Sequence, residues 1–330
     1  MSLIRVISAV ADLLDKTSRM RMGKAWEDPA LDLALPQVKA GRLPHGLELI
    51  KQARGNNELR ALRVEKLAEA AAAHTGALSR QAQDDPDALL WLGAARIKHA
   101  WDIRGGSFAK YVRANRFQSF WQVLAEAEAP LRQAAQALPE DPVPWGHLQW
   151  HAIGMSSGRD ELDTIWKELT ARDPHLYAGH HGRAQALCAK WYGSHRELLA
   201  FAHESVASAP PGDPVTAILA LAHFEIAWSK NGDSDRSAQD GLEAYFGDSD
   251  VAGALSRAAD KWRDDPRPHP RSLEAAHLFG AAFYFGGHLR RAQGFLGETG
   301  RRVPEILPWA AASITPGRRY ARAVRDLGLT

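Results

Sequence analysis

The fold is decided by residues 273–306, which read LEAAHLFGAAFYFGGHLRRAQGFLGETGRRVPEI. Small residues sit among large apolar ones in this stretch, two glycines interrupt its middle, and Pro304 closes it. Small residues let two helices approach closely, while large ones fill the gap to the next pair of helices. The stretch therefore predicts two packed helices, with a close contact at Gly280 and the second helix beginning at Gly287.

Asp-Pro pairs punctuate the rest of the chain, and each one opens an apolar segment. Aspartate accepts hydrogen bonds from the exposed amides of a helix start, and proline fits the first helical position, where its missing N–H costs nothing. Apolar residues then recur at spacings of three and four, and strand patterns are nearly absent. We therefore expect helix starts at Asp28-Pro29, Asp85-Pro86, Asp141-Pro142, Asp173-Pro174, Asp213-Pro214 and Asp265-Pro266.

Residues 273–306 resemble a tetratricopeptide repeat, a helix-turn-helix unit of about 34 residues. Phe279 and Gly280 match the large-small pair of its first helix, and Ala292 and Leu296 match packing positions of its second. The resemblance implies an all-α fold, an irregular tetratricopeptide-like helical-repeat solenoid.

Two upstream segments resemble the same unit with changes in helix length. One begins at Asp85-Pro86 and carries Leu92-Gly93 in its first helix. Its sequence predicts a first helix about one turn longer than that of a tetratricopeptide unit. The other begins at Asp173-Pro174 and carries His181-Gly182.

The repeats divide the chain into three expected regions. Residues 1–85 are an N-terminal helical region that packs on the array, residues 86–306 are the tetratricopeptide-like repeats, and residues 307–330 are a C-terminal capping helix. Apolar residues at helical spacing up to Leu14 predict an amphipathic helix at the start of the chain. An export signal needs an unbroken apolar block, and Asp12 and Asp15 make this stretch unsuitable for one.

Composition excludes several classes of protein. The chain has 41 Lys and Arg against 39 Asp and Glu, so its net charge of +2 disfavours a nucleic-acid partner. Charges interrupt every apolar run before it reaches the roughly 20 residues that cross a bilayer, so we expect no membrane partner. The single cysteine, Cys188, rules out an intramolecular disulfide and indicates a reducing, cytoplasmic location.

The resemblance to tetratricopeptide repeats also implies a function, because such arrays bind peptides or partner proteins on a concave face lined by first helices. We therefore expect a nonenzymatic binding or scaffold protein. The repeat frame places His277 and Tyr284 toward that groove, and the analogous frames upstream place Lys98, His180, Arg183 and Glu225 there.

The chain has 11 tryptophans, and most of them fall in helical patterns where they should fill space between helices. A few could instead form an aromatic pocket beside Arg60, Arg63 and Arg104. Such a pocket would suit an acidic or aromatic ligand.

Histidine supports an alternative function. Several of the 14 histidines lie between residues 147 and 223, and His147 and His151 are spaced to share one helix face. This alternative is an enzyme on a helical scaffold, with a small-molecule pocket in the histidine- and tryptophan-rich middle of the chain, working with or without a metal ion. The zinc-protease motif has a glutamate directly after its first histidine, and no glutamate follows His147. The residues around Cys188 and Ser194 match no motif of a catalytic nucleophile. We assign no metal site, no cofactor and no catalytic residue.

Two further segments complete the sequence analysis. Residues 187–202, LCAKWYGSHRELLAFA, resemble a segment of an uncharacterised bacterial family, and this resemblance implies no function. Residues 318–325, RRYARAVR, form a basic run, which also suits the dipole near a helix end.

Overall fold

The computed structural model describes residues 20–105, 114–232 and 237–329. Packing divides them into two compact units. Unit 1 is Asp28–Ala186, and unit 2 comprises residues 20–27 together with the chain from Leu187 onward. The predicted all-α fold is confirmed, since the regular structure of the described ranges is helical apart from one pair of two-residue strands.

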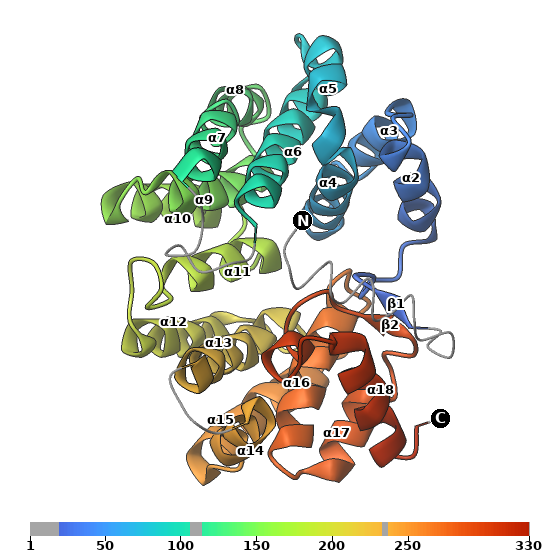
Figure 1. Ribbon diagram of the computed structural model, residues 1–330, viewed down its shortest axis with the longest axis vertical. Coiled ribbons are helices and arrows are strands. Elements are labelled where there is room, and N and C mark those ends of the chain that lie inside the picture. The colour runs from blue at the N-terminus through green and yellow to red at the C-terminus, as the bar shows by residue number, and fades with distance from the viewer. Residues whose placement is uncertain (1–19, 106–113, 233–236, 330) are drawn as a thin grey trace. The chain divides into compact units, whose positions relative to one another are not determined.

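Unit 1 consists of helices that pack against their neighbours along the chain (Figure 1). Its elements are α2 (Pro29–Lys39), α3 (Pro44–Gln52), α4 (Asn57–Ala71), η1 (Ala72–His74), α5 (Thr75–Ala82), α6 (Pro86–Arg104), α7 (Ala114–Ala125), α8 (Glu128–Ala137), α9 (Val143–Met155), α10 (Arg159–Arg172) and α11 (Tyr177–Ala186).

Unit 2 combines helices with the strand pair and includes both a segment before unit 1 and the chain after it. Its elements are β1 (Arg21–Met22), α12 (His195–Ser208), η3 (Pro214–Ala217), α13 (Ile218–Gly232), α14 (Ala238–Phe246), α15 (Ser249–Arg263), α16 (Ser272–Phe285), α17 (Leu289–Leu296), β2 (Arg302–Val303), η4 (Trp309–Ala311) and α18 (Pro316–Asp326).

The Asp-Pro pairs start helices at several of the expected places. Asp28 and Asp85 cap α2 and α6 directly, and their carboxylates accept hydrogen bonds from first-turn amides. Asp213 caps the 3₁₀ turn η3, which runs into α13. The helices that follow Asp141 and Asp173 begin slightly later, at Val143 and Tyr177.

The expected helix start at Asp265-Pro266 is wrong. Residues 264–270 form an irregular exposed to half-buried segment, and α16 begins only at Ser272. Pro268 and Pro270 explain this difference, because each proline disfavours helical geometry in the residue before it and supplies no backbone N–H.

The hairpin expected from residues 273–306 is present as α16 and α17. The helices pack against each other and are joined by residues 286–288, where Gly287 has a φ of 77°, so the two helices run antiparallel. A Cβ on Gly280 would lie 2.6 Å from Leu296 Cγ, which places the predicted close contact where the pattern indicated. The second helix begins at Leu289, two residues later than expected.

A similar close contact occurs in unit 1, where a Cβ on Gly93 would lie 2.5 Å from Leu131 Cγ of α8. Helix α6 has 19 residues and α16 has 14, so the expected longer first helix is confirmed. These helix pairs are compatible with a helical-repeat protein.

The strand pair ties residues 20–27 to the far end of the chain. β1 runs parallel to β2 with Arg21 opposite Arg302, and the Lys24 amide donates to the Val303 carbonyl at 3.1 Å (Figure 1). Trp26, directly after this pair, is buried. Residues 20–27 therefore belong to unit 2, although the residues that follow them begin unit 1.

The remaining sequence-based expectations for the architecture have the following outcomes. The amphipathic helix expected before Leu14 lies outside the described residues. The regions 1–85, 86–306 and 307–330 stay a prediction, and the division by packing runs through the second of them at residue 187. Among the helices that the structure describes, none combines the length and apolar composition that a membrane crossing requires.

Candidate functional site

The residues predicted to line a groove fall in both units. Lys98, Arg104, His180 and Arg183 belong to unit 1, and Glu225, His277 and Tyr284 belong to unit 2. Each set is therefore described within its own unit.

Lys98 and Arg104 lie on α6 and have different surroundings. The Lys98 ammonium is 3.7 Å from the Glu69 carboxylate. The Arg104 guanidinium lies over the Trp101 ring, 5.3 Å from its centroid, and burial lowers its pKa from the ordinary arginine value. Arg104 remains a cation at neutral pH, so this end of α6 presents a positive charge on an aromatic ring.

His180 and Arg183, on α11, both contact Trp166 of α10. The His180 ring meets the Trp166 ring edge-on at 5.1 Å, and Arg183 lies 6.0 Å from the centroid of the same ring while it pairs with Asp163 at 2.5 Å. His180 Nε2 is also 2.8 Å from the Pro174 carbonyl. Burial lowers the pKa of His180 to about 4, so this imidazole is neutral at pH 7 and joins two helices.

Glu225 of unit 2 forms an ion pair with Lys190 at 2.8 Å. Burial, and secondarily the Glu225 charge, raise the pKa of the nearby Cys188 thiol to about 12. Because the thiolate is the nucleophilic form of cysteine, this environment opposes nucleophilic chemistry at Cys188. Cys188 is buried, as expected, but it lies in the turn after α11 and not within a helix.

His277 and Tyr284, on α16, contact the C-terminal segment of unit 2. His277 is fully buried, its Nε2 lies 2.6 Å from the Arg302 carbonyl, and its Nδ1 accepts from Trp309 Nε1 at 3.1 Å. Both ring nitrogens are therefore used, and burial lowers the pKa of His277 to about 4. The Tyr284 hydroxyl donates to the Asp326 carboxylate at 2.5 Å.

The histidines of the middle region are divided between the two units. His151 is buried, and burial lowers its pKa below the ordinary histidine value, whereas His147, expected on the same face, is half-buried. In unit 2, His223 bonds the Tyr245 hydroxyl at 2.9 Å. Within the described ranges, no group of three or more His, Cys, Asp and Glu side chains is arranged to hold a metal ion.

An open pocket of about 260 Å³ lies in unit 2, outside the region suggested for a small-molecule site. Arg263 lines it, pairs with Glu298 at 2.6 Å and lies over the Phe295 ring at 4.4 Å. The pocket is lined by Trp262, Arg263, Pro266, Arg267, Pro268, Ser272 and Glu298. Glu298 pairs with Arg263, and Arg267 pairs with Asp265 outside the pocket, so the charged groups of the lining already have partners.

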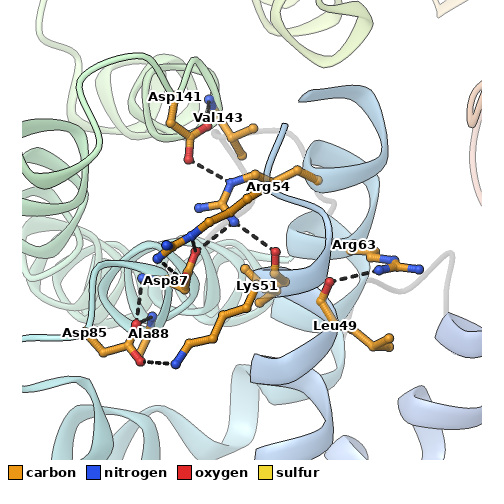
Figure 2. Close-up of polar contacts among 11 residues, drawn as sticks. Leu49, Lys51, Arg54, Arg63, Asp85, Asp87, Ala88, Asp141 and Val143 are labelled. Carbon is orange, nitrogen blue, oxygen red and sulfur yellow. Dashed lines mark hydrogen bonds and ion pairs between the residues drawn. The ribbon is translucent and has the colours of Figure 1, made fainter. Parts of the chain in front are cut away.

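A set of ion pairs with a buried centre, which we call the α4 hub, joins several helices of unit 1 (Figure 2). Arg60 of α4 is 2% exposed and bonds two carboxylates, Asp87 at 2.8 Å and Asp141 at 2.7 Å. It also donates to the Ile50 carbonyl at the end of α3. One side chain therefore joins α3, α4, the first turn of α6 and the segment that leads into α9.

The aspartates of the Asp-Pro pairs supply much of the α4 hub. Asp28 pairs with Arg63 at 2.8 Å, and Asp85 pairs with Lys51 at 2.6 Å. Burial opposes ionisation of Asp85, but hydrogen bonds from Lys51 and from two backbone amides outweigh it, so the pKa of Asp85 falls below the ordinary value. Four carboxylates and four cations balance in the hub, counting Arg54 on Asp87. This balance indicates a structural network and not a ligand site.

The hub revises one interpretation of the arginines. Arg60 and Arg63, considered for an aromatic pocket with Arg104, are buried in ion pairs. Sequence reasoning missed the hub, although a signal existed: both arginines lie on the same helical stripe as the buried Val64, Leu67 and Ala71. Buried arginines require carboxylate partners, and the capping aspartates provide them.

Aromatic side chains gather where α6, α7 and α9 meet, and we call this surface the aromatic face. It comprises Trp101 and Arg104 of α6 with Phe117, Phe120 and Trp121 of α7. Trp101 meets Phe120 edge-on at 5.1 Å, and Phe117 lies 5.4 Å from Trp121. Helix α9 contributes Gly154, where a Cβ would come within 2.9 Å of Phe120 and 3.3 Å of Trp101.

Trp121 is the most accessible ring of the aromatic face, with 46% of its surface exposed. Its indole nitrogen donates to the Gly154 carbonyl at 3.2 Å, which fixes the orientation of an otherwise exposed ring. Of the other ten tryptophans, four are buried and six are half-buried, and the buried ones are Trp26, Trp91, Trp262 and Trp309. The composition could not distinguish Trp121 from these, because its exposure depends on which helices cover α7.

Comparison with known proteins finds no match for this chain, either among protein-family models or among curated proteins.

Proposed function

We propose that this chain is a tetratricopeptide-like binding protein that captures a peptide segment of a partner protein on the aromatic face of unit 1. The observation that carries the proposal is Trp121, whose ring is 46% exposed and is held in one orientation by a hydrogen bond to Gly154. Covering this ring with an apolar partner surface would remove apolar area from water and so favour binding.

The chemistry of the aromatic face suits peptide recognition. Tryptophan and arginine are enriched among the residues that dominate the energetics of protein interfaces. Tryptophan buries a large area and fixes only two rotatable bonds, and arginine supplies several hydrogen-bond donors. Arg104 adds a cation over Trp101, which favours a segment that carries a carboxylate beside an apolar or aromatic side chain. The preferred ligand is thus an acidic, apolar peptide.

Preorganisation supports the same proposal. The α4 hub joins the starts of α6 and α9, and these helices carry Trp101 and Gly154 to the aromatic face. A rigid surface loses less conformational entropy on binding than a mobile one. The hub therefore favours affinity without touching the ligand.

The enzyme alternative has less support. Burial holds Cys188 as a thiol, and the imidazoles of His180 and His277 serve as structural hydrogen-bonding groups. A metal-dependent enzyme would bring stoichiometric iron, zinc or copper with the purified chain, and elemental analysis measures this directly.

Selection from a random peptide library displayed on phage tests the proposed function. We expect the wild-type chain to enrich acidic peptides that contain aromatic or large apolar residues. Fluorescence anisotropy with a selected peptide should show at least tenfold weaker binding to Trp121→Ala and weaker binding to Arg104→Gln. Trp121→Phe, which keeps an aromatic ring, should retain most of the affinity.

Leu289→Ala is the matched control, because Leu289 is 50% exposed but lies in unit 2. It should bind the selected peptide like the wild type. Equal binding by Trp121→Ala and the wild type would exclude the aromatic face as the binding surface. Circular dichroism confirms that each variant is folded.

A further inference from the structure

Two exposed isoleucines lie in the segment between β2 and α18. Ile306 is 49% exposed and Ile314 is 62% exposed, and Leu307 and Ala310 between them are half-buried. We call these four residues the isoleucine surface. Single exposed apolar residues are ordinary on proteins, but several exposed on one short segment are typical of a surface that another segment covers.

Backbone hydrogen bonds hold this segment in a compact turn. The Ala310 amide donates to the Ile306 carbonyl at 2.8 Å, and the Ala312 amide donates to the Trp309 carbonyl at 3.2 Å. Trp309 is buried, and its indole donates to His277 of α16 at 3.1 Å. The isoleucine surface is therefore anchored from below by the core of unit 2.

The described part of the chain begins beside this segment. β1 runs parallel to β2, and the Arg21 amide donates to the Arg301 carbonyl at 2.7 Å. A Cβ on Gly23 would lie 3.8 Å from Glu305 Cβ. The chain therefore enters unit 2 about five positions before Ile306 along the same strand direction. Five extended residues span roughly 17 Å, so a short turn brings the preceding residues back to the isoleucine surface.

The sequence before residue 20 suits such a return. Apolar residues recur at spacings of four, three and four at Leu3, Ile7, Val10 and Leu14, which is the pattern of one helix face. Residues 15–19, DKTSR, are all polar and have the length of the turn. An amphipathic helix is stable in a protein when its apolar face is buried against another surface.

We propose that residues 3–14 form an amphipathic helix that docks its apolar face on the isoleucine surface. The proposal is independent of the proposed function, which rests on the aromatic face of unit 1. Docking removes both apolar faces from water. Because the helix is tethered at residue 20 by a short linker, its effective concentration at this surface is of the order of millimolar.

Other occupants fit this surface less well. A stable interface between two copies engages about 20–30 residues a side, whereas the isoleucine surface has four. A second copy would also compete with the tethered helix. A helix that lies on lipid carries a polar face rich in lysine and arginine, but the polar face of residues 3–14 contains Arg5, Ser8 and Asp12 and has no net charge.

Hydrogen exchange of the full chain tests the docking. Val10→Asp/Leu14→Asp places two charges on the apolar face, so it should speed amide exchange at residues 304–316 at least fivefold and lower the melting temperature. Arg5→Gln/Ser8→Asp changes the net charge by the same amount on the polar face. This control should exchange within twofold of the wild type over the same residues.

A double-mutant cycle separates docking from independent effects on the two segments. Ile306→Ser/Ile314→Ser removes the surface that the helix covers. Adding Val10→Asp/Leu14→Asp to it should therefore speed exchange at residues 304–316 no further and lower the melting temperature little further. Leu289→Ser is the matched control, because Leu289 is 50% exposed in the same unit. Its effect should add to that of Val10→Asp/Leu14→Asp.

Four outcomes would overturn the proposal. The first two are unchanged exchange at residues 304–316 in Val10→Asp/Leu14→Asp and full additivity in the isoleucine cycle. The third is a dimer in sedimentation velocity that Ile306→Ser/Ile314→Ser dissociates, which would assign the surface to a second copy. The fourth is binding to phosphatidylserine vesicles that Val10→Asp/Leu14→Asp abolishes, which would assign the helix to lipid.

This test does not depend on the aromatic face. Val10→Asp/Leu14→Asp should bind the phage-selected peptide like the wild type, and Trp121→Ala should leave exchange at residues 304–316 unchanged. Failure of one proposal is thereby distinguished from failure of the other.

Discussion

Gly280 and Gly294 belong to the same helical hairpin, but their surroundings differ. A Cβ on Gly280 would meet Leu296 at 2.6 Å, whereas a Cβ on Gly294 would meet nothing within 4 Å. Gly280→Leu should therefore destabilise the chain by roughly 1–3 kcal/mol or more through overpacking. Gly294→Leu should be neutral or stabilising by about 0.5–1 kcal/mol, because leucine favours a helix more than glycine does.

Urea denaturation of both glycine variants measures this difference in the free energy of unfolding. If Gly280→Leu were as stable as Gly294→Leu, the close packing of α16 on α17 would be wrong.

His277 makes the stability of unit 2 depend on pH. Its pKa is lowered to about 4 by burial, from an ordinary value near 6.5. Below pH 6.5 the unfolded chain takes up a proton that the folded chain does not, so this stabilisation is complete above pH 6.5 and is lost progressively as pH falls toward 4. Between pH 6.5 and 5 the loss from His277 alone is about 2 kcal/mol.

His277→Phe tests this dependence. The variant should be less stable than the wild type at pH 7.5, because it loses the hydrogen bonds to Trp309 and Arg302, but it should lose less stability between pH 7.5 and 5. His288→Gln, at an exposed position of the same unit, should show the wild-type dependence on pH. Urea denaturation at the two pH values compares the three proteins, and parallel losses in all three would contradict the assignment.

Trp121 shows where sequence reasoning stopped at the level of single residues. Its indole is one of 11 in the chain, and helical spacing favours packing for most of them. Exposure is decided by the contacts of α7 with α6 and α9, which place Gly154 beneath the ring. No local pattern encodes which side of α7 stays uncovered.

Among the elements, the α4 hub gives Arg60 the largest expected effect of a single substitution. Arg60→Met would leave the buried Asp141 without its arginine partner and Asp87 with the half-exposed Arg54, so we expect a loss of about 3–5 kcal/mol in the free energy of unfolding. Thermal denaturation followed by circular dichroism measures this loss. Arg80→Met, at an exposed position, should change stability by less than about 0.5 kcal/mol.

Replacing Asp87 and Asp141 together with Arg60 shows whether the stability lost in Arg60→Met comes from unpaired carboxylates or from lost packing. Arg60→Met/Asp87→Asn/Asp141→Asn should recover at least part of the stability that Arg60→Met loses, because no buried carboxylate remains. Full additivity of the destabilising effects would show that these groups are not coupled.

The helices could be predicted largely from local rules, and the exceptions have physical reasons. Aspartate capping and proline at the first turn act within a few residues, so α2 and α6 begin where the Asp-Pro pairs indicate. At Asp265 the following prolines override the same signal. Two features have no local signal. Each strand is only two residues long, too short to show the alternation of apolar and polar residues that marks a strand. The partner carboxylates of Arg60 lie far from it in the sequence, so no local pattern predicts the α4 hub.

For the whole molecule, the division into units predicts which residues exchange their amide hydrogens faster after a substitution at Trp26. Trp26 is buried and belongs to unit 2, although unit 1 begins two residues later. Trp26→Ala should cost about 3–5 kcal/mol and should raise amide hydrogen exchange mainly at residues 187–329. Trp121→Ala is the control in unit 1 and should leave exchange in that range unchanged. Faster exchange confined to 28–186 in Trp26→Ala would contradict the division.

The pairing of β1 with β2 also sets an order of events during biosynthesis. The two strands are about 280 residues apart, and the whole of unit 1 lies between them. At a translation rate of about 5–20 residues per second, roughly 15–55 s pass between the emergence of β1 and that of its partner. The ribosome therefore completes unit 1 while β1 still waits for its partner, and residues 20–27 can join unit 2 only after β2 has emerged.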